Sequence, residues 1–408
     1  MTDAATILCK AMRTELVDHL LPYWAQQVID HKHGGFIGRI ASDGYVDAYA
    51  DKGAILNTRM LWTFSAAYRV LRDEDYKKIA DRAYAYLEQR FRDPSYGGLY
   101  WMLDYTGHPI EDKKQVYAQA FALYAYSEYA RATGYVPARE RAIALWRLLE
   151  QHRDTRWGGY YEGFSRTWGV LGDMRLSDKD PNVPKGMNTH LHVLEAYTNL
   201  YRIWPDPLLH ERLTAVIRLF LDHIIDPVTS HMRLYFDEDW TPLDTTVSYG
   251  HDIEASWLLY EAAEVLGDPD VMHDVEQSAI ALAETTLNGG FDQDGGLFNE
   301  KAASGHLDDD KHWWPQAEAI VGCLNAYHLT LEKAYLNQAL KTWQFVEHQL
   351  IDHEHGEWFW RVSRNGVPAL DEDKVGPWKG PYHNVRACLE VMERIHARQQ
   401  ARLGLHIG

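Results

Sequence analysis

The sequence predicts an all-α protein, an (α/α)6 barrel (a toroid) with short β-hairpins in its connecting loops. Two observations predict it. A small-residue turn followed by a short aromatic, strand-like run recurs six times, and helical patterns fill the intervals. The turns recur about every 61 to 73 residues, which is room for two helices and a hairpin, and they begin at Gly34, Gly97, Gly158, Ser230, Gly295 and Gly356.

The intervals carry apolar residues at three- and four-residue steps. These steps predict helices at residues 54–71, 117–133, 190–203, 254–266 and 317–331. No Ser/Gly/Pro-rich linker and no low-complexity tract separates them, so we expect a single catalytic domain of residues 1–408. An open solenoid of helix pairs is the alternative, but six is also the number of pairs that closes this barrel.

Composition is typical of a soluble globular protein: 408 residues, 46% hydrophobic and 25% charged. The net charge of −18, from 41 basic and 59 acidic residues, argues against nucleic acid or a membrane as a partner. No stretch approaches the roughly 18 apolar residues of a membrane helix. A cytoplasmic protein is expected, because the start does not resemble a signal peptide and the three cysteines lack metal spacing. No apolar patch for a partner can be identified, which favours a monomer.

The segment Ser248–Trp257 is the most informative part of the chain. His251, Glu254 and Trp257 follow one another at steps of three, so on a helix they share one face. An imidazole and a carboxylate are costly to bury unpaired, which makes them poor core residues. Together with an indole they suit a sugar site. The imidazole can transfer a proton, the carboxylate can orient the imidazole, and the indole offers a flat apolar face on which a pyranose ring can stack.

Two histidines lie close together at the start of the predicted helix 190–203. On a helix, the side chains of His190 and His192 point about 200° apart and cannot chelate one ion, so no metal site is expected. We expect His192, one turn after Asn188, to face the cavity.

Arg59 lies at a largely apolar helix start, where an arginine is either paired or extends towards solvent. One interpretation is an ion pair at the edge of the core. The other is a cation beside a developing enolate oxygen.

Tryptophans accompany the polar groups in two segments. Trp313 and Trp314 precede Glu318, which falls one turn after Trp314 on the same face and could bind hydroxyls. Trp378 lies between two prolines in a stiff loop, which favours a sugar-stacking plate over a core residue.

His251 and His383 lie far apart in the sequence, and we expect them on the fifth and the closing inner helices. In a closed ring such positions approach one cavity from two sides. Inversion at a carbon requires this arrangement, because one base removes the proton from one face and another group returns a proton to the other. Histidine suits both roles, since its unperturbed pKa of about 6.5 lies near working pH.

At these residues the sequence resembles the N-acylglucosamine 2-epimerase superfamily, and within it most closely the cellobiose 2-epimerase branch. The resemblance runs nearly end to end and implies an (α/α)6 barrel, in agreement with the repeat. It is carried by residues 52–59, 173–180, 187–197, 248–254, 310–318, 356–360 and 374–383.

The resemblance implies epimerisation at C2 of the reducing-end glucose of β-1,4-linked disaccharides, through ring opening and a cis-enediolate, without a cofactor. His251 and His383 would be the acid/base pair, with His192 assisting ring opening. Arg59 would stabilise the enediolate, and Glu254 would hold His251 or a sugar hydroxyl. Sugar contacts are implied at Tyr117, Asp180, Asn188, Trp314, Glu318 and Trp378, and Trp257 and Trp313 complete the expected binding residues.

Three other functions compete with this one. A glycoside hydrolase also uses this barrel, but its chemistry needs two carboxylates flanking the scissile bond, whereas histidines dominate here. A non-catalytic sugar-binding protein would need no pair of proton carriers. A monosaccharide 2-epimerase or mannose isomerase would share the histidines. The aromatic and polar surface of residues 168–180, 313–314 and 378 exceeds what one hexose needs, which favours a disaccharide.

Overall fold

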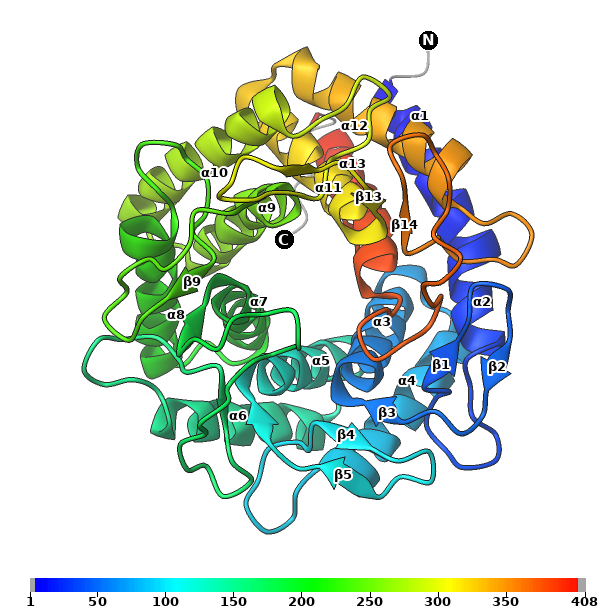
Figure 1. Cartoon of the computed structure of the whole chain (residues 1–408), viewed down its shortest axis with the longest axis vertical. Coiled ribbons are helices and arrows are strands. Elements are labelled where there is room, and N and C mark those ends of the chain that lie inside the picture. The colour runs from blue at the N-terminus through cyan, green and yellow to red at the C-terminus, as the bar shows by residue number, and fades with distance from the viewer. Residues whose placement is uncertain (1–3, 403–408) are drawn as a thin grey trace.

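The computed structural model describes residues 4–402 and forms a closed ring of two helical layers (Figure 1). In this part of the chain, the six inner helices are α3 (Ala54–Leu71), α5 (Val116–Thr133), α7 (Met187–Ile203), α9 (Tyr249–Leu266), α11 (Trp313–Thr330) and α13 (Tyr382–Arg402). The outer helices are α1 (Ala4–Thr14) with α2 (Leu21–Gln26), α4 (Glu74–Tyr86), α6 (Val136–Gln151), α8 (Pro207–Leu219), α10 (Pro269–Gly289) and α12 (Lys333–Phe345). The predicted all-α (α/α)6 barrel is confirmed.

Four of the outer helices contain or end in a π-helical turn. These turns are η1 (Glu15–Leu20), which joins α1 to α2, η2 (Leu87–Phe91), η3 (Phe220–Ile224) and η4 (Val346–Leu350). The last three each end two residues before the aspartate that opens the following turn, namely Asp93, Asp226 and Asp352.

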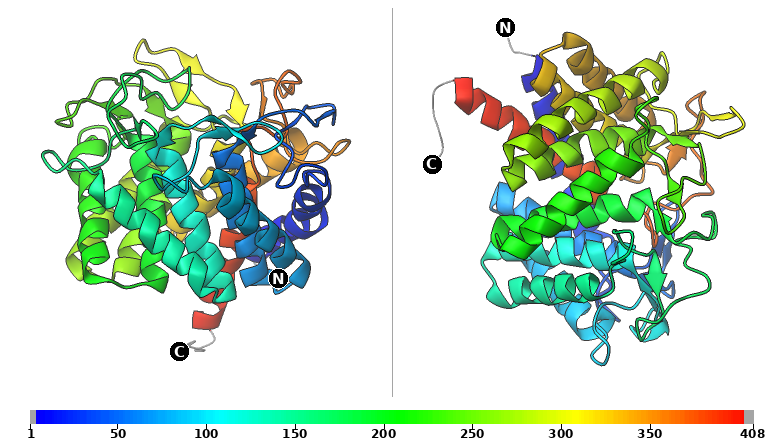
Figure 2. Two further views of the ribbon diagram at one scale, coloured as in Figure 1. Left: turned by 90° about the horizontal axis from the view of Figure 1, so that it is seen from below. Right: turned by 90° about the vertical axis from the view of Figure 1, so that its left-hand side faces the viewer.

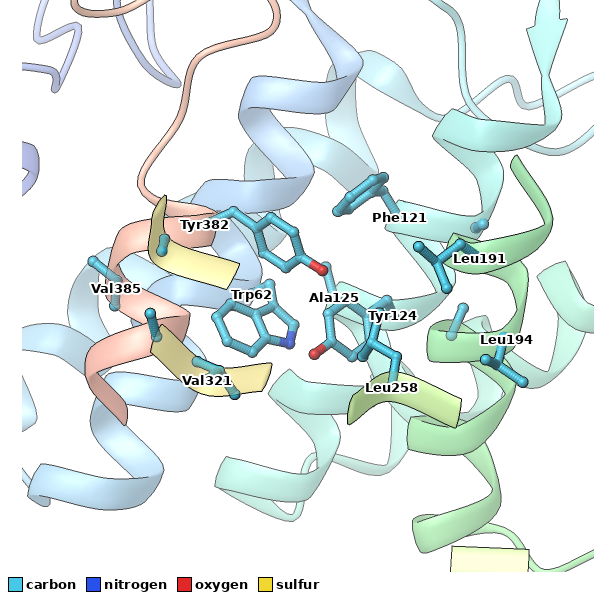
Figure 3. Close-up of a cluster of buried hydrophobic side chains, with 14 of the residues drawn as sticks. Trp62, Phe121, Tyr124, Ala125, Leu191, Leu194, Leu258, Val321, Tyr382 and Val385 are labelled. Atoms are coloured by element: carbon cyan, nitrogen blue, oxygen red, sulfur yellow. The ribbon is translucent and has the colours of Figure 1, made fainter. Parts of the chain in front are cut away.

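The inner helices are buried on nearly all sides, because each one packs against an outer helix and two inner neighbours. In α5, every residue except Arg131 and Thr133 is buried. Large aromatic side chains meet across the middle of the ring (Figure 3): Trp62 stacks on Tyr124 at 5.3 Å, and Tyr382 lies edge-on to Trp62 at 5.3 Å. Below this layer, at the C-terminal ends of the inner helices, lies a rear cavity of about 600 Å³.

Hairpins and long loops gather at the opposite end, which we call the front, while α13 extends from the rear (Figure 2). A short strand before an inner helix pairs antiparallel with a strand of the next repeat. These pairs are β3 (Lys52–Gly53) with β4 (Met102–Leu103), β6 (Lys114–Gln115) with β7 (Gly163–Phe164), β8 (Lys185–Gly186) with β9 (Tyr235–Phe236), β10 (Val247–Ser248) with β11 (Glu300–Lys301), and β13 (Lys311–His312) with β14 (Arg361–Val362). A bridge between Ile40 and Val375 closes the ring. The remaining strands are β1 (Arg39–Ile40), β2 (Val46–Asp47), β5 (Pro109–Glu111) and β12 (Leu307–Asp308).

A buried lysine–aspartate ion pair fastens these strands to the preceding turns. Lys185 Nζ, for example, lies 2.7 Å from Asp154 Oδ2, and both side chains are almost completely buried. Asp154 also accepts hydrogen bonds from two backbone N–H groups of its own turn. The corresponding pairs are Lys52–Asp30, Lys114–Asp93, Lys311–Asp292 and Lys374–Asp352. In the remaining repeat, Asp226 pairs with Arg233 at 3.1 Å.

Three inner helices begin three to five residues earlier than predicted, at Met187, Tyr249 and Trp313. Their first turns carry polar and aromatic residues of the front mouth, which interrupt the apolar pattern. His251 lies on α9, which is the fourth inner helix, so its predicted position on the fifth inner helix is wrong. At the other end of α11, Leu331 adopts φ 63° and caps the helix instead of extending it.

In residues 4–402, no helix combines the length and the apolar character needed to cross a membrane.

Candidate functional site

The front mouth of the ring holds the candidate site, because every inner helix begins there after a strand or loop and points its first turns towards the axis. The structure brings most of the expected residues to this mouth from all six inner helices. They are Arg59 on α3, Tyr117 on α5, Asn188 and His192 on α7, His251 and Glu254 on α9, Trp314 and Glu318 on α11, and His383 on α13.

Three histidines of the site are held in the same way, through Nδ1. The Nδ1 atom of His251 lies 2.7 Å from Ser248 Oγ, and that of His383 lies 2.7 Å from Glu318 Oε1. His192 Nδ1 lies 3.0 Å from Glu195 Oε2. Since Nδ1 is engaged in each ring, Nε2 is the nitrogen left for a ligand.

Burial keeps the two central histidines neutral. It lowers the pKa of His251 to about 3, and nearby His192 acts in the same direction. Burial also lowers the pKa of His383 well below its usual value, and the positive charges of Arg59 and Arg386 add to the effect. A neutral imidazole can accept a proton, so both rings are in the form that a general base requires.

His251 and His383 lie against one indole. The ring centroid of Trp314 is 4.6 Å from that of His251 and 5.6 Å from that of His383. The two imidazoles therefore approach the cavity from α9 and α13, with the α11 tryptophan beside both.

Arg59 has no carboxylate within 4 Å among residues 4–402, so the ion-pair interpretation of this arginine is not what the structure shows. One guanidinium nitrogen donates to the carbonyl oxygen of Trp378 at 2.6 Å, and the other donates to Tyr117 Oη at 3.1 Å. The guanidinium also lies 4.6 Å from the ring of Phe121. With 3% of the residue exposed, Arg59 is a buried positive charge at the site that no carboxylate of the described residues neutralises.

Glu254 does not hold His251, which is bound to Ser248. The Oε1 atom of Glu254 instead lies 2.5 Å from Arg386, a buried arginine on α13 that also binds Glu318 at 2.7 Å. Burial raises the pKa of Glu254 to about 7, with a further contribution from Glu318.

Ligand-type atoms of Glu254, Glu318 and His383 lie within 4.8 Å of one another, as the ligands of a metal ion would. Glu318 Oε1, however, already accepts a hydrogen bond from Arg386 and lies 2.7 Å from His383 Nδ1. The guanidinium of Arg386 thus supplies the positive charge that these carboxylates need.

Asp180 and Asn188 border a small cavity of about 110 Å³ that also reaches His251. Asp180 accepts hydrogen bonds from Tyr235 Oη at 3.0 Å and from Ser177. The Oδ1 atom of Asn188 is buried without a hydrogen-bond partner in the described part of the chain, so it is an acceptor available to a sugar hydroxyl.

Three expected sugar contacts are placed differently. Trp257 and Trp313 are only 1% and 3% exposed, too buried to act as stacking plates. Trp257 donates its indole N–H to Glu318 Oε2 at 3.1 Å, and Trp313 packs against Trp360 at 4.6 Å. Glu318 has both oxygens occupied, so it holds His383 rather than a sugar hydroxyl.

Trp378 remains half-buried at the mouth and lies 5.6 Å from Trp101, a second tryptophan that sequence reasoning did not select. Both border a cavity of about 460 Å³, together with Arg175 and Ser177.

Sequence reasoning missed two of the three residues that hold the histidines, Glu195 and Ser248, and also Arg386, which binds the carboxylates of Glu195 and Glu318. Glu195 follows His192 by three positions, Arg386 follows His383 by three, and Ser248 precedes His251 by three. That spacing puts each partner on the face of its histidine, so it was a usable signal. Tyr382, whose hydroxyl donates to Glu195, had no such signal.

Comparisons with known proteins identify the family to which the chain is similar. The family model for N-acylglucosamine 2-epimerase matches residues 35–387. A cellobiose 2-epimerase of Bacteroides fragilis is 47% identical over 95% of this chain and 99% of its own length, and one of Dictyoglomus turgidum is 37% identical over the same shares. The solved structure of a cellobiose 2-epimerase from Bacillus thermoamylovorans is 41% identical, with a TM-score of 0.92 over 95% of this chain and 99% of that one.

Proposed function

The chain belongs to the N-acylglucosamine 2-epimerase family and is a carbohydrate epimerase, and on that basis we propose that it epimerises C2 of the reducing-end glucose of β-1,4-linked disaccharides. It would convert cellobiose to glucosyl-mannose and lactose to epilactose. The observation that carries the proposal is the pair of neutral imidazoles, His251 and His383, beside one indole and each held through Nδ1.

The reaction begins with opening of the reducing-end sugar to its aldehyde, which His192 would assist. The C2 proton then becomes acidic, because C2 lies next to a carbonyl. The Nε2 atom of one histidine removes this proton, and the C–H electrons form the C1–C2 double bond of an enediolate. The other histidine, which has taken up a proton on Nε2 from solvent for this step, gives that proton to the opposite face of C2, and this exchanges the glucose and mannose configurations. The first ring is left protonated and returns its proton to solvent. Return of the proton to C1 instead would give the ketose as a side product.

Arg59 would stabilise the negative oxygen of the enediolate. It is a buried cation whose nearest partners are a carbonyl and a phenol, so its charge is not neutralised before the substrate binds. A preorganised positive charge in a site that excludes water stabilises a developing anion strongly. All these steps are proton transfers and charge stabilisation, for which the protein's own residues suffice.

The cavity beside Trp101 and Trp378 supports a disaccharide over a single hexose. Its volume of about 460 Å³ adds to the space around the histidines, and the two indoles offer apolar faces to the second sugar ring. The 47% identity to a cellobiose 2-epimerase agrees with this choice.

Proton NMR of the purified protein with cellobiose in D2O, with EDTA present, tests the proposal. The expected result is a mannose-configured disaccharide that carries deuterium at C2. Deuterium exchange with mannose, glucose or fructose but none with cellobiose would move the assignment to a monosaccharide epimerase or mannose isomerase. Free glucose without C2 exchange would indicate a hydrolase.

A matched variant, Trp101→Ala, separates the disaccharide site from the chemistry. It removes an indole that lies outside the histidine cluster, so kcat/KM should fall about tenfold for cellobiose. The exchange rate at C2 of mannose should stay within about twofold. A ratio of kcat/KM for cellobiose over mannose below one in the unmodified protein would contradict the disaccharide assignment.

A further inference from the structure

We propose that Arg386 is a positioning residue for catalysis: it fixes His192 and His383 in the tautomer that carries hydrogen on Nδ1 and leaves the Nε2 lone pair for the sugar. This inference rests on the proposed function and adds to it the residue that prepares two of its histidines at once.

Arg386 lies at the centre of a buried charge cluster. It is 1% exposed, and one guanidinium nitrogen binds Glu195 while the other binds Glu254 at 2.5 Å and Glu318 at 2.7 Å. Two of these carboxylates hold histidines: Glu195 Oε2 is 3.0 Å from His192 Nδ1, and Glu318 Oε1 is 2.7 Å from His383 Nδ1. One side chain on α13 therefore reaches two histidines on different helices through their carboxylate partners.

The charge of Arg386 decides the direction of those hydrogen bonds. An ionised carboxylate only accepts, so it selects the imidazole tautomer with hydrogen on Nδ1. A buried carboxyl that lost its cation would take up a proton and donate it to Nδ1. The imidazole hydrogen would then move to Nε2, and Nε2 of His383 could no longer remove the C2 proton.

The titration behaviour of Glu195 supports this argument. Burial acts to raise its pKa, but the charge of Arg386 outweighs burial and the pKa of Glu195 is lowered. For Glu318, burial raises the pKa, and Arg386 is the largest opposing influence. For both carboxylates, the guanidinium of Arg386 is the largest influence that favours the ionised form.

The Arg386 side chain fills a flat slot between the rings of Trp257 and Tyr382, and the shape of this slot requires arginine. The guanidinium lies 4.7 Å from the ring of Trp257 and 4.2 Å from that of Tyr382, between two aromatic side chains. Its separate nitrogens reach carboxylates on α7, α9 and α11. The ammonium group of a lysine is a point charge, so it cannot stack between the two rings and bind all three carboxylates at once.

We expect a small cation in solution to approach the space around Arg386 from the rear cavity. Glu195, which binds Arg386 directly, is 4% exposed and borders the rear cavity of about 600 Å³. Removal of the Arg386 side chain would leave a flat space between aromatic rings, open towards Glu195. Free guanidinium matches that space in shape and charge, whereas urea matches it in shape alone.

The test combines the variants Arg386→Lys and Arg386→Ala with turnover of cellobiose, thermal unfolding and 15N–1H NMR of histidine-labelled protein. Signals of His192 and His383 are assigned with His192→Gln and His383→Gln. In Arg386→Lys we expect kcat to fall at least 100-fold with KM within about threefold, and hydrogen to appear on Nε2 of one or both rings. In Arg386→Ala, millimolar guanidinium should restore kcat at least tenfold, and urea at the same concentration should not.

Arg394→Lys is the matched control. Arg394 lies on the same helix and also stacks on Trp257, at 5.4 Å, but it pairs with Glu390 and Asn325. Its kcat and histidine signals should be unchanged.

An Arg386→Lys protein with unchanged tautomers, or with kcat within threefold of the original, overturns the inference. Loss of its cooperative unfolding transition would show a purely structural role and would also overturn it. The NMR measurement needs no substrate, so it tests the tautomers independently of activity. An unmodified protein that is inactive on cellobiose would refute the proposed function without deciding the tautomer result.

Discussion

The Nδ1 atom of His383 lies 2.7 Å from Oε1 of Glu318, so a buried carboxylate holds this imidazole. His251, the other candidate proton carrier, is instead held by a neutral hydroxyl, that of Ser248. The two histidines are therefore not equivalent, because an ionised partner strengthens the basicity of a ring and a neutral hydroxyl does so less.

Replacement of each histidine by asparagine should expose the face that the other one serves. We expect His251→Asn and His383→Asn to lose interconversion by about 10²–10⁴-fold. The remaining histidine should still exchange the C2 hydrogen of one epimer with D2O, and the two variants should act on opposite epimers. Proton NMR of each variant with cellobiose and with its mannose-configured epimer measures both effects.

The double variant should exchange neither epimer, which controls for contaminating enzyme. A single variant that still interconverts the epimers at the original rate, while its thermal unfolding is unchanged, would rule out the two-histidine mechanism.

The ring was predictable because its signals are local and repeated. The first residue of each of the six turns adopts positive φ, for example 77° at Gly158 and 57° at Ser230, which is why five of the six turns begin with glycine. The bounds of the helix at 54–71 were predicted correctly, since its first three residues are apolar. The start of α9 was missed by five residues, because Tyr249–Ile253 mixes a glycine, a histidine and an aspartate that serve the mouth and not the helix pattern.

The site was predictable as a set of residues but not as a set of contacts. Steps of three placed Glu254 and Trp257 on the face of His251, yet both side chains turn to Arg386 and the core. Arg386 lies more than 130 residues from Glu254, and no local pattern connects them. Long-range ion pairs of this kind depend on how the ring closes, which spacing along one helix cannot tell.

Arg59 should contribute to the rate far more than to substrate binding. Its guanidinium has no carboxylate partner in the described residues and is poised for an anion that exists only during the reaction. We expect Arg59→Lys to lower kcat about 10²–10³-fold, as loss of one preorganised donor does elsewhere, with KM changed by less than about fivefold. Initial rates over a range of cellobiose concentrations separate the two constants.

Tyr117→Phe is the matched control for Arg59. It removes the hydroxyl that accepts from Arg59 but leaves the guanidinium in place. Its kcat should fall by no more than about tenfold. An Arg59→Lys variant whose KM rises while kcat is unchanged would assign Arg59 to ground-state binding instead.

The buried ion pairs of the front loops should be needed for stability. Lys185 is fully buried, binds Asp154 at 2.7 Å and donates to the carbonyl oxygen of Gly158 at 2.8 Å. Lys185→Met leaves the Asp154 carboxylate buried without its cation, which costs about 3–5 kcal/mol. Urea unfolding followed by circular dichroism measures the change in the free energy of unfolding.

An exposed pair supplies the contrast. Lys78 and Asp75 lie 2.6 Å apart with about three quarters of each side chain exposed, so Lys78→Met should leave the unfolding transition unchanged. Equal effects of the two substitutions would mean that burial of the ion pair at Lys185 is not what matters.

His190 should make the fold sensitive to acid without any part in catalysis. It is fully buried, accepts a hydrogen bond from the backbone N–H of Tyr160 at 2.9 Å, and burial lowers its pKa to about 4. In the unfolded chain the imidazole has its ordinary pKa of about 6.5, so between these values the unfolded state binds a proton that the folded state does not. The contribution of His190 to the free energy of unfolding is therefore fully present above pH 6.5 and falls as the pH drops towards 4.

His190→Gln should remove this part of the acid sensitivity, because glutamine can accept and donate hydrogen bonds but does not ionise. Between pH 7.5 and 4.5, the free energy of unfolding should fall by about 2–3 kcal/mol less in His190→Gln than in the unmodified protein. Urea unfolding at both pH values measures the difference, with exposed His353→Gln as the control. An identical loss in His190→Gln and the unmodified protein would show that protonation of His190 does not drive acid unfolding, whatever the variant does to stability at neutral pH.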